Sequence, residues 1–182
     1  MTGAMAQIGQ LELALHHHNA GELDRAEPIY RALVEHDPGD ADGWHLLGVL
    51  LDQGGDPRGG AELIRRAIAL DDQVAEYHDN LGLALGAAGE LEGAIAAHRR
   101  AVDLAPGSAV ARNNLGAALE RAGRGAEAEA AFRAAIAVDP RHPDALRNLA
   151  VTLGPGGGPA DEAEALLRRA VALAPDDAQN HN

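Results

Sequence analysis

Hydrophobic residues recur along this chain with a period of 34 residues. Trp44, Leu47 and Leu51 lie three and seven residues apart, which places them on one stripe of an α-helix. A fixed period of this length predicts an array of stacked units, in which each unit buries an apolar face against the next. The same stripe returns in three later stretches of the chain, at residues 78–85, 112–119 and 146–153.

A second apolar series follows these stripes, as in Gly60, Ile64 and Ala67. Its spacing of three to four residues again indicates a helix. Glycines such as Gly89 and Gly123 separate the two series, and glycine suits the left-handed residue that follows a helix. Each unit is therefore predicted to be a helix, a tight turn and a second helix.

Glycine also occupies the middle of the first predicted helix in three units, at Gly48, Gly82 and Gly116. A glycine in a helix interior costs about 1 kcal/mol relative to alanine. Its presence there predicts that the partner helix approaches closely.

The first unit departs from the pattern at Pro28, which falls within its second predicted helix. A proline in a helix interior removes a backbone hydrogen bond. Asp24 and Glu27 are suited to capping a helix that starts late. We therefore expect Pro28 to lie in the first turn of that helix.

The composition limits what such an array binds. Hydrophobic residues make up 46% of the chain but aromatic residues only 2%, so the core is expected to consist of aliphatic side chains, with few aromatic-lined pockets for a small molecule. The net charge is −13, which disfavours nucleic acid and anionic membranes as partners, because both need basic surfaces. Arginine without any lysine, together with abundant Ala, Gly and Pro, suggests a GC-rich, bacterial coding sequence.

The chain has no cysteine, and so no disulfide or thiolate metal site. Its first residues lack the basic segment and apolar run of a signal peptide. No apolar stretch approaches the length that spans a membrane. We therefore expect a cytoplasmic protein.

Motifs that carry chemistry are weak in this sequence. The run His16-His17-His18 does not predict a metal site, because consecutive residues of a helix point in different directions. The glycine-rich stretch 154–158 lacks the Gly-Lys-Ser/Thr ending of a phosphate-binding loop. No serine or cysteine is arranged with a histidine and an acid as a nucleophile needs. We expect no active site, no cofactor and no metal.

Asparagine gives the most specific polar signal. Asn80, Asn114 and Asn148 occupy the same place in three successive units, each one residue before a leucine of the apolar stripe. Asparagine is a modest helix former, so its repetition inside a helix asks for a reason. One hypothesis is drift among copied repeats, which leaves an asparagine without a role. The other is a ladder of amides whose donors and acceptors bind a peptide backbone.

The repeated pattern Trp-x2-Leu-Gly-x2-(large), then Ala-x3-(large)-x2-Ala-x4-Pro, resembles the tetratricopeptide repeat. The resemblance implies an all-α solenoid of five antiparallel helix hairpins that forms a right-handed superhelix. It also implies a single domain over residues 1–182. Its units are 7–40, 41–74, 75–108, 109–142 and 143–177, followed by the tail 178–182.

The asparagine series is similar to one along the concave face of the repeat arrays of O-linked N-acetylglucosamine transferases and their bacterial relatives. Asn80, Asn114 and Asn148 fall on the matching positions. Because most charged residues implied for this face are acidic, we expect it to favour basic or neutral peptides. By the same resemblance, the neighbouring residues of the groove are Asp42, His45, Glu76, Asp79, Asn113, Asp144 and Arg147.

These features predict a protein-interaction scaffold that holds an extended segment of a partner in its concave groove. Two alternatives stay open. The chain resembles the arrays that precede the catalytic part of larger glycosyltransferases or sulfotransferases, where it would dock substrates. A self-assembling scaffold is the other alternative.

The last unit suggests where self-assembly would occur. Leu166 and Leu173 repeat an apolar pair that, in earlier units, is expected to cover the first helix of the next unit. Only a short polar stretch follows in this sequence, without a polar capping helix. We expect these two leucines to form an uncovered face that packs against a second copy, a partner or a missing downstream domain.

Overall fold

The computed structural model describes residues 2–157 and 160–173. Ten α-helices and no β-strand make up these residues, so the all-α hairpin architecture is confirmed. In chain order the helices are α1 (Thr2–Asn19), α2 (Leu23–His36), α3 (Ala41–Gln53), α4 (Pro57–Leu70), α5 (Ala75–Ala87), α6 (Leu91–Leu104), α7 (Ala109–Arg121), α8 (Gly125–Val138), α9 (Pro143–Gly157) and α10 (Ala160–Leu173).

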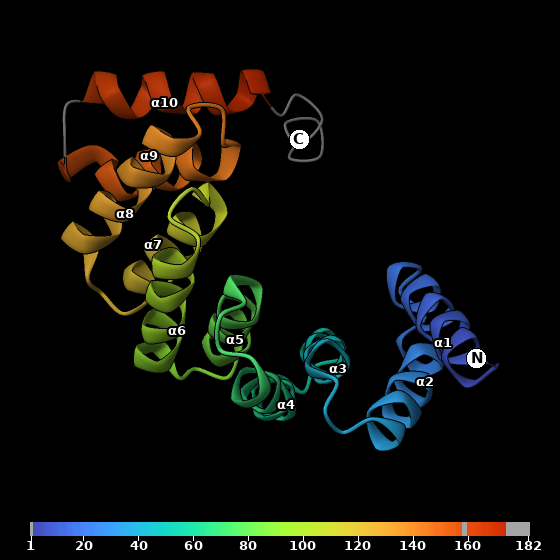
Figure 1. Ribbon diagram of the computed structural model, residues 1–182. Helices are drawn as coiled ribbons and strands as arrows, with labels where there is room; N and C mark the ends of the chain where they lie inside the picture. The colour runs from blue at the N-terminus through green and yellow to red at the C-terminus, as the bar shows by residue number, and fades with distance from the viewer. Residues whose placement is uncertain (1, 158–159, 174–182) are drawn as a thin grey trace. The chain divides into compact units, whose positions relative to one another are not determined.

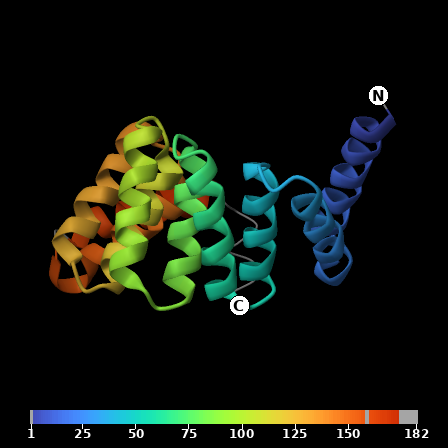
Figure 2. The same ribbon diagram turned by 60° about the horizontal axis from the view of Figure 1, so that its bottom comes forward.

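The chain divides into two compact units, residues 1–90 and 91–182, called here the N-terminal and the C-terminal unit. In the N-terminal unit α1 packs on α2, and α3 packs on both α4 and α5. Both views show α1 running beside α2 (Figures 1 and 2). In the C-terminal unit α7 packs on α6, α8 and α9, and α10 packs on α9. The prediction of one domain over residues 1–182 stays a prediction.

The helix boundaries follow the predicted repeat. The first helices α3, α5 and α7 begin at Ala41, Ala75 and Ala109, which are the predicted first residues of their units. The turn that ends α5 contains Gly89 with a φ of 83°, and the turn after α7 contains Gly123 with a φ of 75°. Both glycines have the left-handed conformation predicted for them.

Glycine allows the paired helices to approach each other closely. A Cβ atom on Gly48 of α3 would lie 2.8 Å from the backbone oxygen of Gly60 and 2.7 Å from the Ile64 side chain, both in α4. A Cβ atom on Gly116 of α7 would lie 2.5 Å from the Phe132 ring of α8. The predicted close approach is therefore confirmed at both glycines.

The late start predicted for the second helix is wrong. α2 begins at Leu23 and carries Pro28 in its interior. A proline there removes one backbone hydrogen bond, at a cost of about 3 kcal/mol. The helix continues past it because Ala26, Tyr30 and Val34 are buried on one of its faces, and that burial offsets the loss.

The last helix turns a different stripe inward than the sequence predicted. Leu166 is buried, with 6% of its surface exposed, whereas Leu167 is 43% exposed. Leu166 lines a hollow together with Ile136 of α8 and Leu149 of α9. The prediction that Leu166 lies on an uncovered face is therefore wrong, while Leu173 is half-buried.

Within residues 2–157 and 160–173, no helix has both the length and the apolar character needed to cross a membrane.

Replacing Gly48 with alanine tests the close packing of α3 on α4. Alanine favours a helix by about 1 kcal/mol over glycine, but its Cβ would meet the fixed backbone of α4. We expect Gly48→Ala to lower the free energy of unfolding by about 1–3 kcal/mol, the usual cost of overpacking. Urea unfolding followed by circular dichroism measures it. Gly9→Ala is the matched control, because a Cβ there meets nothing within 4 Å; it should be neutral or stabilising. Equal effects of both substitutions would contradict the packing argument.

Candidate functional site

The polar residues singled out in the sequence lie on the first helices of the helix pairs, where they form two groups. Because α3 contacts α5 and α7 contacts α9, each group is brought together within its own unit. We name the two surfaces after their helices. The α3–α5 face carries Asp42, His45, Glu76, Asp79 and Asn80, and the α7–α9 face carries Asn113, Asn114, Asp144, Arg147 and Asn148.

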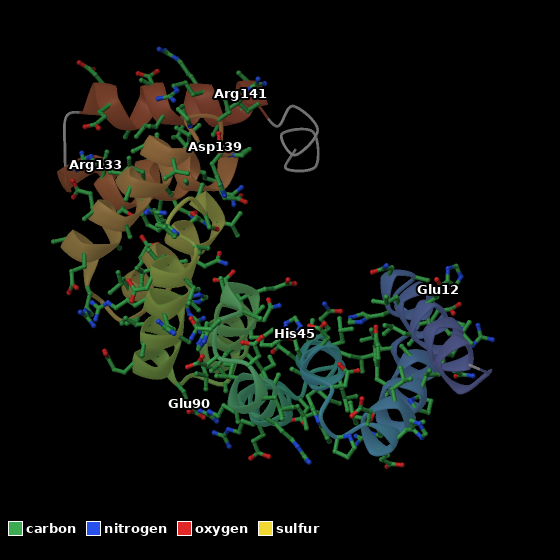
Figure 3. The ribbon with its side chains drawn as sticks, viewed as in Figure 1. Glu12, His45, Glu90, Arg133, Asp139 and Arg141 are labelled. Carbon is green, nitrogen blue, oxygen red and sulfur yellow. The ribbon has the colours of Figure 1, made fainter. Side chains whose placement is uncertain are left out.

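His45 is the centre of the α3–α5 face. Its imidazole is only 4% exposed and extends from α3 toward α5 (Figure 3). Its Nε2 atom lies 2.8 Å from Nδ2 of Asn80, and an amide nitrogen can only donate. With the amide in this orientation Nε2 accepts the hydrogen bond, which corresponds to a neutral ring with its proton on Nδ1.

The Tyr77 ring packs against the His45 imidazole. Sequence reasoning did not identify Tyr77. The two rings have centroids 4.7 Å apart at 35°, and the Tyr77 hydroxyl donates a hydrogen bond to the Asp42 carboxylate. Burial raises the pKa of the Tyr77 phenol, and the hydrogen bond to Asp42 raises it further. The phenol therefore stays a donor at physiological pH and holds Asp42 in place.

One spacing relates three of the polar contacts between neighbouring first helices. Asp42 bonds to Tyr77, His45 to Asn80 and Asn113 to Asn148, and each pair is 35 residues apart. The spacing is one repeat of 34 residues plus one. A residue of one first helix therefore does not meet its own equivalent in the next first helix, but the residue that follows this equivalent. A search of the sequence for polar residues 35 apart would have found Tyr77.

The α7–α9 face has a related geometry but a different charge. Asn148 donates from Nδ2 to Oδ1 of Asn113 at 3.0 Å, and Asn113 is 8% exposed. Asp144 pairs with Arg147 one helical turn later, at 2.7 Å. Because this ion pair compensates the carboxylate, Asp144 does not give the face the acidic character implied by the sequence.

The hydrogen bonds show what two of the asparagines do. Asn80 and Asn148 each bridge to the preceding first helix, and both amides are only partly buried. Bridging was not among the sequence hypotheses, because it differs both from drift without a role and from ligand binding alone. It orients each amide relative to its face.

The charge state of His45 follows from its surroundings. Burial lowers the pKa of the His45 imidazole, because it disfavours the charged form. The carboxylates of Glu76 and Asp42 oppose this shift without reversing it. His45 is therefore neutral at pH 7, in agreement with its role as a hydrogen-bond acceptor.

The histidine run near the N-terminus has ordinary partners. His17 contacts the Glu22 carboxylate at 2.5 Å, and His18 lies 3.0 Å from the Gln53 amide oxygen. Among the residues that the structure describes, no group of three or more His, Cys, Asp or Glu side chains could hold a metal ion.

Comparisons with known proteins agree with this geometry. Models of the tetratricopeptide repeat match residues 11–75, 45–109 and 86–150. These matches name the repeat only, so the narrower similarity to O-linked N-acetylglucosamine transferases stays a prediction. A search of curated proteins gave no significant match.

Solved structures share the fold. A crystal structure of MamA has a TM-score of 0.78 at 25% identity, covering 91% of this chain and 96% of that one. A structure of pilF from Pseudomonas aeruginosa has a TM-score of 0.79 at 23% identity, covering 100% and 79%. The crystal structure of YrrB, described as a TPR protein with an unusual peptide-binding site, has a TM-score of 0.71 at 24% identity, covering 92% and 86%.

The lowered pKa of His45 predicts a specific pH dependence of stability. As pH falls below the usual histidine pKa of 6.5, the unfolded chain takes up a proton that the folded chain refuses. The free energy of unfolding therefore falls with pH in this window. We expect His45→Asn to lose less stability than the wild-type protein between about pH 7.5 and 5.5, as measured by urea unfolding. His16→Asn removes an exposed imidazole instead and is the matched control. Parallel slopes for all three proteins would argue against a buried, neutral His45.

Proposed function

Because this chain belongs to the tetratricopeptide repeat family, we propose that it is a protein-interaction scaffold whose first helices bind an extended segment of a partner. Arrays of this family are interaction scaffolds and in general are not catalytic. The observation that carries the proposal is the fixed orientation of two amides, Asn80 and Asn148, on the α3–α5 and α7–α9 faces.

The amides have the hydrogen-bonding groups that a peptide backbone needs. A primary amide carries two N–H donors and one oxygen acceptor. Asn80 uses one donor on His45, and Asn148 uses one on Asn113. Each then has one N–H and one oxygen for a ligand, which match the C=O and N–H of an extended chain. Since the amides are already oriented, binding loses little side-chain entropy.

The charge of the α3–α5 face favours a basic or neutral segment. Asp42 and Glu76 are exposed on this face, and the whole chain carries a net charge of −13. Exposed carboxylates attract cationic side chains and speed their association. On the α7–α9 face Arg147 compensates Asp144, so the preference for basic residues should arise at the α3–α5 face.

YrrB supports the choice of ligand. Its structure is described as having a peptide-binding site, and it shares this fold over most of both chains. At 24% identity that likeness concerns the fold alone, so peptide binding by this chain is our proposal. Docking of substrates for a larger glycosyltransferase or sulfotransferase stays a prediction, as do the bacterial source and the cytoplasmic location.

Peptide binding can be tested by substituting the asparagines. We expect Asn80, Asn114 and Asn148, replaced together by alanine, to weaken binding of a library of extended peptides by at least about tenfold, since each lost hydrogen bond is worth about 0.5–1.5 kcal/mol. Fluorescence polarisation measures the affinity. Gln73→Ala, which removes an exposed amide from the loop before α5, is the control. Thermal melting checks that the triple variant is folded. Unchanged affinity in a folded triple variant would overturn the proposal.

The charge preference needs its own comparison. We expect Glu76→Gln to weaken binding of basic peptides, and about 0.5 M salt to remove most of the difference between basic and neutral peptides. Glu62→Gln removes a carboxylate exposed on α4, a second helix, and should leave affinity unchanged. Equal binding of acidic and basic peptides at low salt would contradict the preference.

Self-association is a second candidate function, favoured by the outer side of α10. Leu167 is 43% exposed and Val171 is 54% exposed. Together with Glu164, Arg168 and Ala172 they line an open, mostly apolar hollow of about 380 Å³. Exposed apolar surface bordered by charges is typical of an interface. We propose that a second copy covers this stripe, in place of the predicted pair Leu166 and Leu173.

Charge substitutions on α10 test self-association. We expect Leu167→Glu with Val171→Glu to abolish any dimer seen by sedimentation velocity, while the fold is kept because both side chains are exposed. Leu70→Glu, at a similarly exposed leucine of α4, should not change the assembly state. Leu166→Glu should instead unfold α10, because Leu166 is buried. A wild-type protein that stays monomeric at high concentration would rule this candidate out.

A further inference from the structure

His45 and Asn113 occupy the same position of the repeat. They are two periods of 34 residues apart in the sequence, and each lies 35 residues before an asparagine that bonds to it. In one pair the acceptor is an imidazole nitrogen, and in the other it is an amide oxygen. The imidazole titrates near physiological pH and the amide does not. The two faces therefore use the same contact with different sensitivity to protons.

We propose that His45 is a positioning residue that decides which polar groups Asn80 presents to a bound segment, and that protonation of His45 reverses them. The inference rests on the proposed function, since it concerns the same face. It assigns a condition to the partner: a basic segment binds this face when His45 is neutral and is released when His45 is protonated.

The hydrogen-bond geometry requires this reversal. Neutral His45 accepts one N–H of Asn80 at Nε2, so Asn80 presents its oxygen and its other N–H to a ligand. A protonated imidazole has no lone pair left, because both nitrogens carry hydrogen. The amide must then turn about its last side-chain bond and give its oxygen to His45. After that turn Asn80 presents its N–H groups to the ligand in place of its oxygen, which faces His45.

The reversal acts against a basic partner in two ways. The acceptor that received a backbone N–H or a cationic side chain is withdrawn, so the ligand loses a hydrogen bond. The imidazolium also adds a positive charge beside Asp42 and Glu76, which offsets the attraction of this face for cations. Asn148 keeps its orientation, because its partner Asn113 does not titrate.

The surroundings of His45 place the transition below neutral pH. The charged groups that act on the imidazole are Asp42 on its own helix and Glu76 on α5, and the titratable Tyr77 ring stacks on it from α5. Where α4 and α2 pack on α3, Ile64 lies against Gly48 and Val34 against Gly43, and the Arg66 guanidinium of α4 lies over the Trp44 ring. Burial outweighs the two carboxylates and lowers the pKa of His45. His45 is therefore neutral at pH 7, and Asn80 then presents its oxygen on the α3–α5 face.

A reciprocal exchange of residues tests the assignment without any ligand. His45→Asn installs the acceptor of the other face, and Asn113→His installs a titrating one. Nitrogen-15 NMR reports the His45 tautomer and the side-chain amide resonances from about pH 8 to 5. We expect a proton on Nδ1 at neutral pH, and Asn80 amide resonances that move with the His45 titration while those of Asn148 do not. His45→Asn should abolish the movement at Asn80, and Asn113→His should create it at Asn148.

Two NMR results would overturn the inference. One is a proton on Nε2 at neutral pH, because His45 would then donate to Asn80 and could not reverse it. The other is a set of Asn80 resonances that stay constant while His45 titrates. Neither result would contradict the proposed function, because peptide binding is tested separately by the affinity of the wild-type protein.

Binding gives the functional readout. For a basic peptide we expect wild-type affinity to fall by roughly tenfold from about pH 7.5 to the acidic pH at which NMR shows His45 to be protonated. His45→Asn should lose most of this pH dependence, whatever its affinity at neutral pH, whereas His45→Ala should weaken binding at both pH values because Asn80 is no longer oriented. An equal pH dependence in wild type and His45→Asn would overturn the inference alone. A wild-type protein that binds no peptide would overturn the proposed function, and the amide resonances would still decide on His45.

Discussion

The contact between successive first helices is the constraint on which the candidate site depends. α3 against α5 and α7 against α9 bring Asp42, His45 and Asn113 against the residues 35 positions further along the chain. This offset orients the amides of Asn80 and Asn148, and it places the Tyr77 ring against the His45 imidazole. Within a helix pair, glycine permits close packing: at Gly48 even a single methyl group would collide with the backbone of α4.

The repeat produces similar geometry with different chemistry in the two units. Both faces hold an asparagine by a hydrogen bond to the preceding first helix. In the N-terminal unit the acceptor is a buried histidine near exposed carboxylates, whereas in the C-terminal unit it is an amide beside the compensated pair of Asp144 and Arg147. Because a solenoid needs only its apolar stripe to stack, side chains on the open face are free to differ. Copies of one fold thus carry faces of different chemistry.

Much of the fold could be read from periodicity. The starts of α3, α5 and α7, the left-handed glycines Gly89 and Gly123, and the close approach at Gly48 all follow from spacing and from the conformational properties of glycine. The proline in α2 could not be placed, because its cost is local while the burial of Tyr30 that offsets it depends on packing. Local propensity is regularly overridden by tertiary contacts in this way.

The sequence by itself determined the repeat, its register and the line of asparagines, because these depend only on which residues share a helical stripe. The tertiary structure decided which stripe faces inward. On α10 it buries Leu166, which the sequence predicted to be exposed, and exposes Leu167. It also decided that Asn80 has a partner, that the partner is a buried neutral imidazole, and that Tyr77 and Asp42 support it. The physical reason is that the rotation of a helix about its axis is set by the surfaces of its neighbours, and a rotation of one residue changes every contact that a polar side chain makes.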